Sequence, residues 1–475
     1  MRPILIVGAG PAGLALARSL FRRGVPFQVF DSQTDRAERG LGMWGRSQVA
    51  LRSLGLGGLL DDASKTVRIP AAAYRSHSGT WLSASSDTPE NLQQVCSLRE
   101  SHLLAALADG LPKDAVRRGM SLVAANVASD GVALSFDDGS RVEGAAVVGA
   151  DGARSAVRRL AFASSSQEAT DIGFGVHSGV LASVEGDSDW ARAPSGAGAP
   201  PRPFETLARG RRFAMVPLAD GGAFWFASQP LAGDCFNGHR LRDAYADWHA
   251  PIPQALHAAI MDESVVASGG SSATGSGGAN GGSTSGADGG STSGADGGST
   301  SGADGGSTSG ADGGSTSGAI RWERVYAAPV LTQWHDGRVV LVGDAAHAMS
   351  HNLAQGAACA IEGAYLLGEA IGDVAASAAG VDADDGPGLE AAFAAYHAAH
   401  APRVAQCRVT THFTAALAIP ASPASEAVRN AMALVPQPIN SMVFDAALAV
   451  SLGDIPASTR ARWPLGSRDE IHKKH

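Results

Sequence analysis

Three glycines near the N-terminus have a spacing that suits the binding of a phosphate group. Gly8, Gly10 and Gly13 follow a short apolar run, Ile4 to Val7, and Ala12 lies within the same turn. The first glycine allows a tight bend, the second lets a pyrophosphate approach the backbone, and the third lets a helix pack on the strand. The helix that follows presents free N–H groups and the positive end of its dipole to an anion. The pattern predicts a dinucleotide site.

An acid stands where the next strand of this unit ends. The run Phe27 to Phe30 has strand character, and Asp31 follows it, 18 residues after Gly13. A carboxylate at this place accepts a hydrogen bond from a ribose 2′-hydroxyl and repels a 2′-phosphate. We therefore expect FAD or NAD rather than NADP. The alternative is a glycine-rich turn that only packs.

Two further strand ends carry an acid beside glycine. Asp151 follows an apolar run that ends at Val148, and Gly343 with Asp344 follows the run Val339 to Val342. A carboxylate at the carboxyl end of a parallel sheet, as expected for Asp344, can accept hydrogen bonds from sugar hydroxyls.

The order of these motifs resembles that of single-component FAD-dependent monooxygenases of the para-hydroxybenzoate hydroxylase type. Asp151, with Gly152 and Arg158 after it, resembles the DG motif of that family, and Gly343-Asp344 resembles its GD motif. Arg99 stands where the family places an arginine in contact with FAD. The resemblance implies FAD as bound cofactor and NAD(P)H as a transient reductant, in keeping with a single GxGxxG in the sequence. The residues expected to bind the cofactor are Gly8, Gly10, Ala12, Gly13, Asp31, Arg99, Asp151, Gly343, Asp344, Gln355 and Gly356.

The same resemblance implies an activity. We expect a monooxygenase that uses NAD(P)H and O2 to hydroxylate or epoxidise a small aromatic or electron-rich substrate through a flavin C4a-hydroperoxide. One alternative is a flavin reductase or dehydrogenase on the same scaffold, which turns over without O2. Another is a non-catalytic FAD-binding protein. Substrate-stimulated NAD(P)H oxidation that consumes O2 would separate the first from the other two.

The loop after Asp344 departs from the family pattern. The family usually has proline and then Gly-Gln-Gly, where this chain has His351 and then Ala354-Gln355-Gly356. An imidazole with an ordinary pKa near ~6.5 predicts that His351 acts on the substrate, as a base for a phenol or a partner for a carboxylate. Turnover should then depend on pH between about pH 5.5 and 7.5. The alternative is a loop that has drifted, with hydroxylation slow or lost.

The elements that must position these residues are those of an α/β fold. A Rossmann-like FAD-binding domain is expected over residues 1–65, 95–168 and 320–372, with an inserted antiparallel β-sheet substrate domain over 66–94 and 169–267. A C-terminal helical region is expected over 389–475. Within the inserted sheet, core packing is expected for Phe224 and Phe226, because only one face of a strand can line a substrate site.

Residues 268–319 are predicted to be a disordered Gly/Ser repeat linker. The octapeptide GGSTSGAD occurs four times from Gly281. So short a repeat has no hydrophobic face to bury, which favours a flexible coil over a solenoid or a calcium-binding repeat.

Composition excludes several classes of protein. The net charge of −9 offers no basic face to nucleic acid, and no apolar run approaches the roughly 18 residues of a membrane span. Four dispersed cysteines predict a reducing compartment, and we expect the cytoplasm. His347 and His351 have the i, i+4 spacing of a metal pair but lie in a turn, so no metal site is expected.

Overall fold

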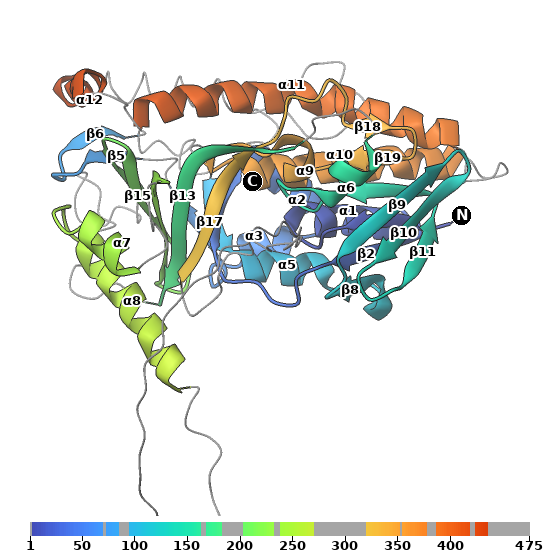
Figure 1. Cartoon of the computed structure of the whole chain (residues 1–475), viewed down its shortest axis with the longest axis horizontal. Coiled ribbons are helices and arrows are strands. Elements are labelled where there is room, and N and C mark those ends of the chain that lie inside the picture. The colour runs from blue at the N-terminus through green and yellow to red at the C-terminus, as the bar shows by residue number, and fades with distance from the viewer. Residues whose placement is uncertain are drawn as a thin grey trace, which may run out of the picture.

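A mainly parallel sheet forms the centre of the nucleotide-binding half (Figure 1). The computed structural model describes residues 2–69, 73–84, 95–162, 168–182, 203–231, 238–269, 320–351, 354–377, 386–418 and 423–435. Across the sheet the strands are β18 (His335–Asp336), β19 (Val339–Leu341), β12 (Ala146–Gly149), β1 (Ile4–Val7), β2 (Phe27–Asp31) and β8 (Val116–Arg118). All neighbouring pairs are parallel except β18–β19. The residues of β1, β12 and β19 are buried, as expected for a sheet covered on both faces.

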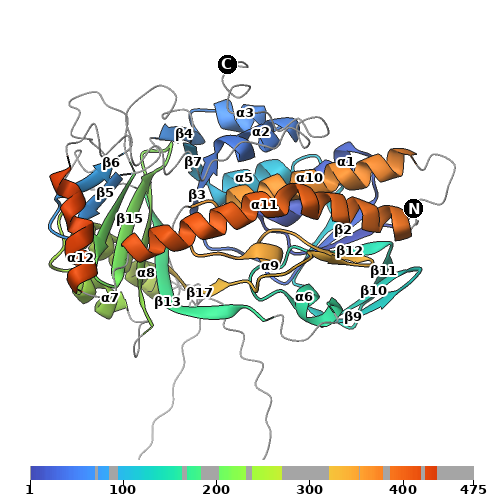
Figure 2. The same cartoon turned by 90° about the horizontal axis from the view of Figure 1, so that it is seen from above.

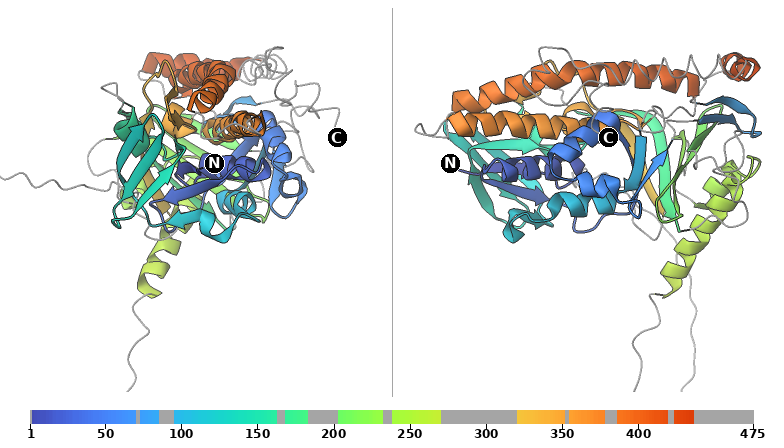
Figure 3. Two further views of the ribbon diagram at one scale, coloured as in Figure 1. Left: turned by 90° about the vertical axis from the view of Figure 1, so that its right-hand side faces the viewer. Right: turned by 180° about the vertical axis from the view of Figure 1, so that it is seen from behind.

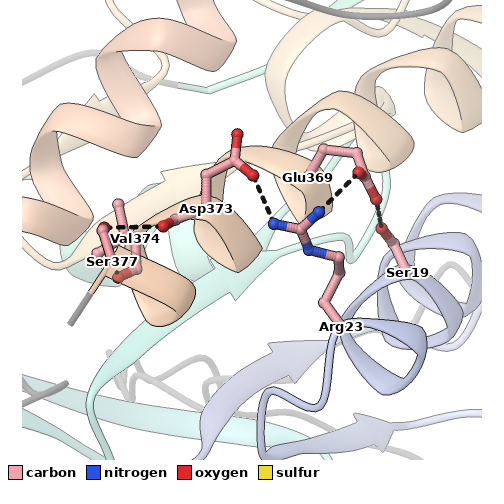
Figure 4. A network of polar contacts seen from close by, with 6 residues as sticks. All are labelled: Ser19, Arg23, Glu369, Asp373, Val374 and Ser377. Atoms are coloured by element: carbon pink, nitrogen blue, oxygen red, sulfur yellow. Dashed lines mark hydrogen bonds and ion pairs between the residues drawn. The ribbon is translucent and has the colours of Figure 1, made fainter. Parts of the chain in front are cut away.

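Two helices pack together beside this sheet. Helix α1 (Pro11–Arg22) lies against α10 (Gly356–Ser377), and a Cβ at Gly368 would come within 2.4 Å of Ser19, which shows how closely they approach. Arg23 joins them by ion pairs to Glu369 and Asp373, and Ser19 donates to the same glutamate (Figure 4). The predicted strand and helix are confirmed, and the helix is followed by a glycine turn at Gly24, which has φ of 69°.

A seven-stranded sheet forms the second half (Figures 1 and 2). Its strands are, in order, β17 (Ile320–Ala327), β13 (Thr170–Leu181), β16 (Ala223–Pro230), β15 (Arg211–Pro217), β14 (Phe204–Ala208), β5 (Ala73–Ser76) and β6 (Trp81–Ala84). Helices α7 (Gly238–Ala244) and α8 (Ile252–Gly269) cover the face that points away from the parallel sheet (Figure 1). That face carries the core of this half, around Phe213, Trp225 and Tyr245.

Sheet membership corrects two predicted boundaries. Ile320–Ala327 forms β17 and pairs with β13, so it belongs to the inserted sheet rather than to the FAD-binding domain. Residues Thr66–Ile69 form β4, which pairs with β7 (Val95–Arg99) beside β3 (Gly40–Trp44) in a separate three-stranded sheet. Both errors arose because strand pairing joins residues that are far apart in the chain, and the local sequence pattern does not reveal which strand is the partner.

The remaining elements complete the frame around the two sheets. They are α2 (Gly45–Ser53), α3 (Gly57–Asp61), α5 (Glu100–Ala108), η1 (Lys113–Ala115), β9 (Leu122–Ala128), β10 (Gly131–Phe136), β11 (Arg141–Gly144), α6 (Ala156–Ala161) and α9 (Asp344–His347). Strands β9 to β11 form their own antiparallel sheet.

A long C-terminal helix spans both halves. Helix α11 (Gly386–Ala418) lies along α10 and reaches toward the seven-stranded sheet, where α12 (Pro423–Asn430) and η3 (Ala431–Leu434) follow (Figures 2 and 3). These helices coincide with much of the region 389–475 for which helices were predicted, and residues 436–475 lie outside the described part. Helix α8 extends to Gly269, two residues into the predicted linker, and residues 270–319 also lie outside the described part. Within the described residues, no helix combines the length and apolar character needed to cross a membrane.

Candidate active site

The glycine turn after β1 is packed at two of its glycines and open at the third. Gly8 has φ of 107°, and a Cβ there would lie 2.2 Å from the Ala150 carbonyl oxygen. A Cβ at Gly13 would lie 1.8 Å from the Gly8 carbonyl oxygen. At Gly10 the nearest atom to an added Cβ is Nη1 of Arg36, 4.0 Å away. Gly8 and Gly13 therefore allow close packing, and Gly10 leaves the backbone accessible to a ligand.

The N-terminus of α1 is suited to an anion. Gly10 is its N-cap residue, Pro11 follows, and among the described residues no side chain caps the helix. The first N–H groups of a helix lack partners within the helix and carry a positive partial charge. This end of α1 fits a pyrophosphate.

Asp31 lies at the end of β2, as predicted, and is 4% exposed. Its carboxylate accepts hydrogen bonds from the backbone N–H groups of Ala9 and Gln33, at 3.0 Å each. It also forms ion pairs with Arg36 at 2.6 Å and with Arg118 at 3.8 Å. NADP was excluded because the carboxylate of Asp31 would repel a 2′-phosphate. The two neighbouring cations weaken that repulsion.

The DG motif is tied to the GD motif by hydrogen bonds. Asp151 accepts from Oγ of Ser155 at 2.5 Å and from the N–H of Val157 at 3.1 Å. Desolvation nevertheless raises the pKa of Asp151. Arg158 is buried, and its guanidinium donates to the carbonyl oxygen of Ala345, one residue beyond Asp344.

The GD motif meets the glycine turn directly. Gly343 has φ of 61°, and a Cβ there would lie 2.9 Å from the Ala12 side chain. Asp344 is exposed, although the residues on both sides of it are buried. A Cβ at Gly356, the first residue of α10, would lie 4.0 Å from Oδ1 of Asp344. The structure therefore brings the glycine turn, both Asp–Gly motifs and the start of α10 together at the carboxyl edge of the parallel sheet.

Two predicted cofactor residues use their side chains elsewhere. Arg99, the N-cap residue of α5, donates to Asp220 at 2.9 and 2.6 Å and so links α5 to the seven-stranded sheet. Gln355 is 2% exposed, and its side-chain oxygen accepts from Arg403 at 2.7 Å. Contact of either residue with FAD stays a prediction.

Arg39 was missed by sequence reasoning. It forms two hydrogen bonds to buried Glu100, and its positive charge acts on Asp344. The Arg39 guanidinium overcomes the effect of desolvation and lowers the pKa of Glu100. The only signal in the sequence was a pair of arginines in the loop after β2, and a loop does not reveal where its side chains point.

His351 lies against the seven-stranded sheet. Its ring meets that of Phe226 edge to face, with centroids 5.0 Å apart. Nε2 is buried and has no hydrogen-bond partner among the described residues. Desolvation and the charge of Arg212 lower the pKa of His351 to about 3. The expected pKa near ~6.5 is therefore wrong, and the imidazole is neutral near pH 7.

The aromatic run on β16 is oriented opposite to the expected way. Trp225 is fully buried in the core under α7 and α8. Phe224 and Phe226 are partly exposed on the other face, where Phe224 contacts Gly40 and Phe226 contacts His351. The prediction that these two phenylalanines pack in the core is wrong, because register decides which alternate residues face inward.

Two charged residues share that face of the sheet. Arg212 is fully buried, lies 5.5 Å from the Phe226 ring centroid and pairs with Glu205 at 2.5 Å.

The ring of His347 is buried beside Trp334 and His400. Over the described ranges, no three His, Cys, Asp or Glu side chains gather as a metal site would require.

Comparisons with known proteins identify this arrangement. A family model described as FAD binding domain matches residues 1–226 and 317–386. Aurachin C monooxygenase/isomerase of Stigmatella aurantiaca is 25% identical over 372 residues, covering 77% of this chain and 79% of that protein. The 3-amino-4-hydroxybenzoate 2-monooxygenase PtmB3 of Streptomyces platensis is 26% identical over 412 residues, covering 81% and 82%. Klebsiella pneumoniae HpxO, solved with FAD and uric acid, is 19% identical with a TM-score of 0.68, covering 95% of this chain and 98% of that one.

These matches confirm the predicted fold class, with FAD as the cofactor. These relatives and the FAD-dependent urate hydroxylase of Klebsiella oxytoca are named as monooxygenases or hydroxylases, so the prediction of an FAD-dependent oxidoreductase with monooxygenase activity is confirmed, and a non-catalytic protein is not favoured. The glycine turn, the helix terminus and the exposed carboxylate of Asp344 fit the phosphate and sugar groups of FAD. The chain belongs to the FAD binding domain family.

Proposed function

We propose that this monooxygenase hydroxylates a small, planar, uncharged aromatic compound that carries a hydroxyl group, with NAD(P)H and O2 as co-substrates. The observation that carries the proposal is Nε2 of His351, which is buried and lacks a hydrogen-bond partner among the described residues. A buried polar atom without a partner costs about 1–3 kcal/mol, and a substrate hydroxyl would remove that cost.

The neighbouring groups favour an uncharged ring. Phe224 and Phe226 offer apolar faces and edges to an aromatic compound. Arg212 already has Glu205 as a counter-ion, and His351 is neutral, so this face supplies little net charge to balance a substrate carboxylate. Of the two partners expected for His351, the phenol is thus the better match, with the imidazole as hydrogen-bond acceptor rather than strong base.

The chain's residues have distinct roles in this proposal. Gly10 and the start of α1 would hold the pyrophosphate, Asp344 would accept hydrogen bonds from the ribityl hydroxyls, and the N–H groups that begin at Gly356 would help to hold the flavin. When bound, FAD supplies the activation of O2 and the transfer of one oxygen atom to the ring. The seven-stranded sheet orients the substrate and excludes water.

The names of relatives support a hydroxylated aromatic ring, whereas the uncharged character of the substrate rests on the residues of this chain alone, because a benzoate carries a carboxylate. These names include 3-amino-4-hydroxybenzoate 2-monooxygenase and a 2-heptyl-3-hydroxy-4(1H)-quinolone synthase of Pseudomonas aeruginosa, the latter 27% identical over 377 residues. Both names describe hydroxylated aromatic rings. We place the reaction in the cytoplasm, where NAD(P)H is available and cysteine thiols are reduced unless an oxidant reaches them.

The test is NAD(P)H oxidation and O2 uptake by the holoenzyme with matched substrate pairs. Phenols and hydroxyquinolines should stimulate both rates, whereas their O-methyl ethers should stimulate them at least tenfold less. Equal stimulation by hydroxyl and methoxyl compounds would reject the role of His351. Stimulated NAD(P)H oxidation without O2 uptake would instead indicate a reductase.

A further inference from the structure

Two buried cysteines meet behind the proposed flavin loop. Cys359 lies on α10 and Cys407 on α11, and their sulfur atoms are 3.6 Å apart. Both side chains are fully buried. They are 48 positions apart in the chain, so only the packing of α10 against α11 brings them together.

The pair is connected to the loop that precedes α10. Cys407 Sγ donates to Oε1 of Gln355 at 3.0 Å, and Arg403 donates to the same oxygen at 2.7 Å. Gln355 lies between Ala354, with φ of 50°, and Gly356, the first residue of α10. The thiol of Cys407 therefore helps to hold the loop that we propose contacts the flavin.

Charged groups make the two thiols unequal. Arg403 and Arg46 approach the buried carboxylate of Glu362 at 3.6 and 3.5 Å. Hydrogen bonding from Cys359 and the charge of Arg403 lower the pKa of Cys407, whereas the same hydrogen bond and burial raise the pKa of Cys359. A thiolate is the reactive form of cysteine, so Cys407 is the better nucleophile and Cys359 is placed to react second.

We propose that Cys359 and Cys407 form a peroxide-sensitive dithiol that closes to an intramolecular disulfide. Hydrogen peroxide is the oxidant. The Cys407 thiolate attacks one peroxide oxygen, the O–O bond breaks, and the hydroxide that leaves takes up a proton to give water. The sulfur of Cys359 then attacks the sulfenic acid at Cys407, and the S–S bond forms as a second water leaves with the Cys359 proton. Two thiols lose two electrons, which reduce one peroxide to two waters.

Closure of the bridge removes the S–H group that Cys407 donates to Gln355. It also draws two sulfur atoms from 3.6 Å to the bonded distance of about 2.05 Å, which shifts α10 against α11. The formation of the bridge is independent of the proposed substrate. Its effect on the flavin rests on the proposed position of FAD.

The experiment exposes the FAD-loaded enzyme to a small excess of hydrogen peroxide, removes the peroxide with catalase, and blocks the remaining thiols with N-ethylmaleimide in denaturant at neutral pH. We expect two of the four cysteines to escape alkylation, and peptide mass analysis to find Cys359 joined to Cys407. Dithiothreitol should restore both thiols. Alkylation of both residues after treatment, or oxidation to sulfinic acid without a bridge, would overturn the proposal.

Two variants sharpen the test. Cys96→Ser removes a buried thiol on β7 and should leave bridge formation unchanged. Cys407→Ser keeps a donor for Gln355 but removes the nucleophile, so the bridged peptide should be absent. A reversible change of the flavin absorption spectrum should accompany bridging in the unsubstituted chain and in Cys96→Ser. A bridged protein with an unchanged spectrum would reject the link to the flavin loop.

Discussion

Replacement of Gly10 by alanine separates cofactor binding from folding. Gly10 has φ of −77° and ψ of −173°, an extended conformation that alanine adopts without strain, and the new Cβ would meet only Nη1 of Arg36 at 4.0 Å. Alanine allows the unfolded chain fewer conformations than glycine does, which stabilises the folded variant by about 0.4–1 kcal/mol. Alanine is also a poorer N-cap residue than glycine, which offsets a similar amount. The melting temperature of the apoprotein should therefore change by less than about 2 °C.

The same methyl group should weaken FAD binding. It projects from the backbone where the pyrophosphate must approach, and loss of one hydrogen bond to a charged group costs about 1.5–3 kcal/mol. At about 1.4 kcal/mol per factor of ten, the Kd for FAD should rise roughly 10-fold to 100-fold. The Kd is measured by titrating apoprotein with FAD and following the quenching of flavin fluorescence.

Two further glycines serve as controls. Gly58, in α3, has no atom within 4 Å of an added Cβ, so Gly58→Ala should leave the Kd unchanged. Gly13→Ala places a Cβ 1.8 Å from the Gly8 carbonyl oxygen and should reduce the yield of folded protein itself. If Gly10→Ala is folded and binds FAD within a factor of about three of the parent, the assignment of this turn to the pyrophosphate is refuted.

Three other changes test the rest of the reasoning. Deleting residues 270–318 and closing the gap with a short Gly/Ser loop should leave FAD content and melting temperature nearly unchanged, because each doubling of loop length costs only about 0.6 kcal/mol. A large fall in either quantity would show that the repeat contacts the core. Ala354→Gly should raise the free energy of unfolding, measured in urea, by about 1 kcal/mol, since Ala354 has φ of 50°; no increase would contradict strain at this residue. The pKa of His351, about 3 in the folded protein, lies below its unfolded value, so its contribution to stability is complete above the unfolded pKa and declines as pH falls below it. In His351→Gln the free energy of unfolding should depend less on pH between about pH 6 and 4. The pH dependence of turnover between about pH 5.5 and 7.5 should stay unchanged, and an altered turnover profile would show that His351 titrates there.

Local pattern was sufficient to predict the nucleotide-binding half. The uniformly apolar run Ile4–Val7 and the glycine turn before α1 each carry a signal within a few residues, and the strand and the helix were found as predicted. Parallel strands end at one edge of their sheet, so the acids at or just after the ends of β2, β12 and β19 lie along the same edge. This is why Asp31, Asp151 and Asp344 could be placed at that edge without knowledge of the structure.

The substrate side depended on the tertiary structure. A strand pattern shows that alternate residues share a face but not which face is covered, so Phe226 was assigned to the core and instead faces His351. The pKa of His351 is set by burial and by Arg212, a residue 139 positions earlier in the chain. The contact between Cys359 and Cys407 likewise exists only because α11 packs on α10. Sequence thus determined the elements and the cofactor, through interactions between near neighbours, whereas strand register and helix packing decided which side chains surround the substrate and which thiols meet.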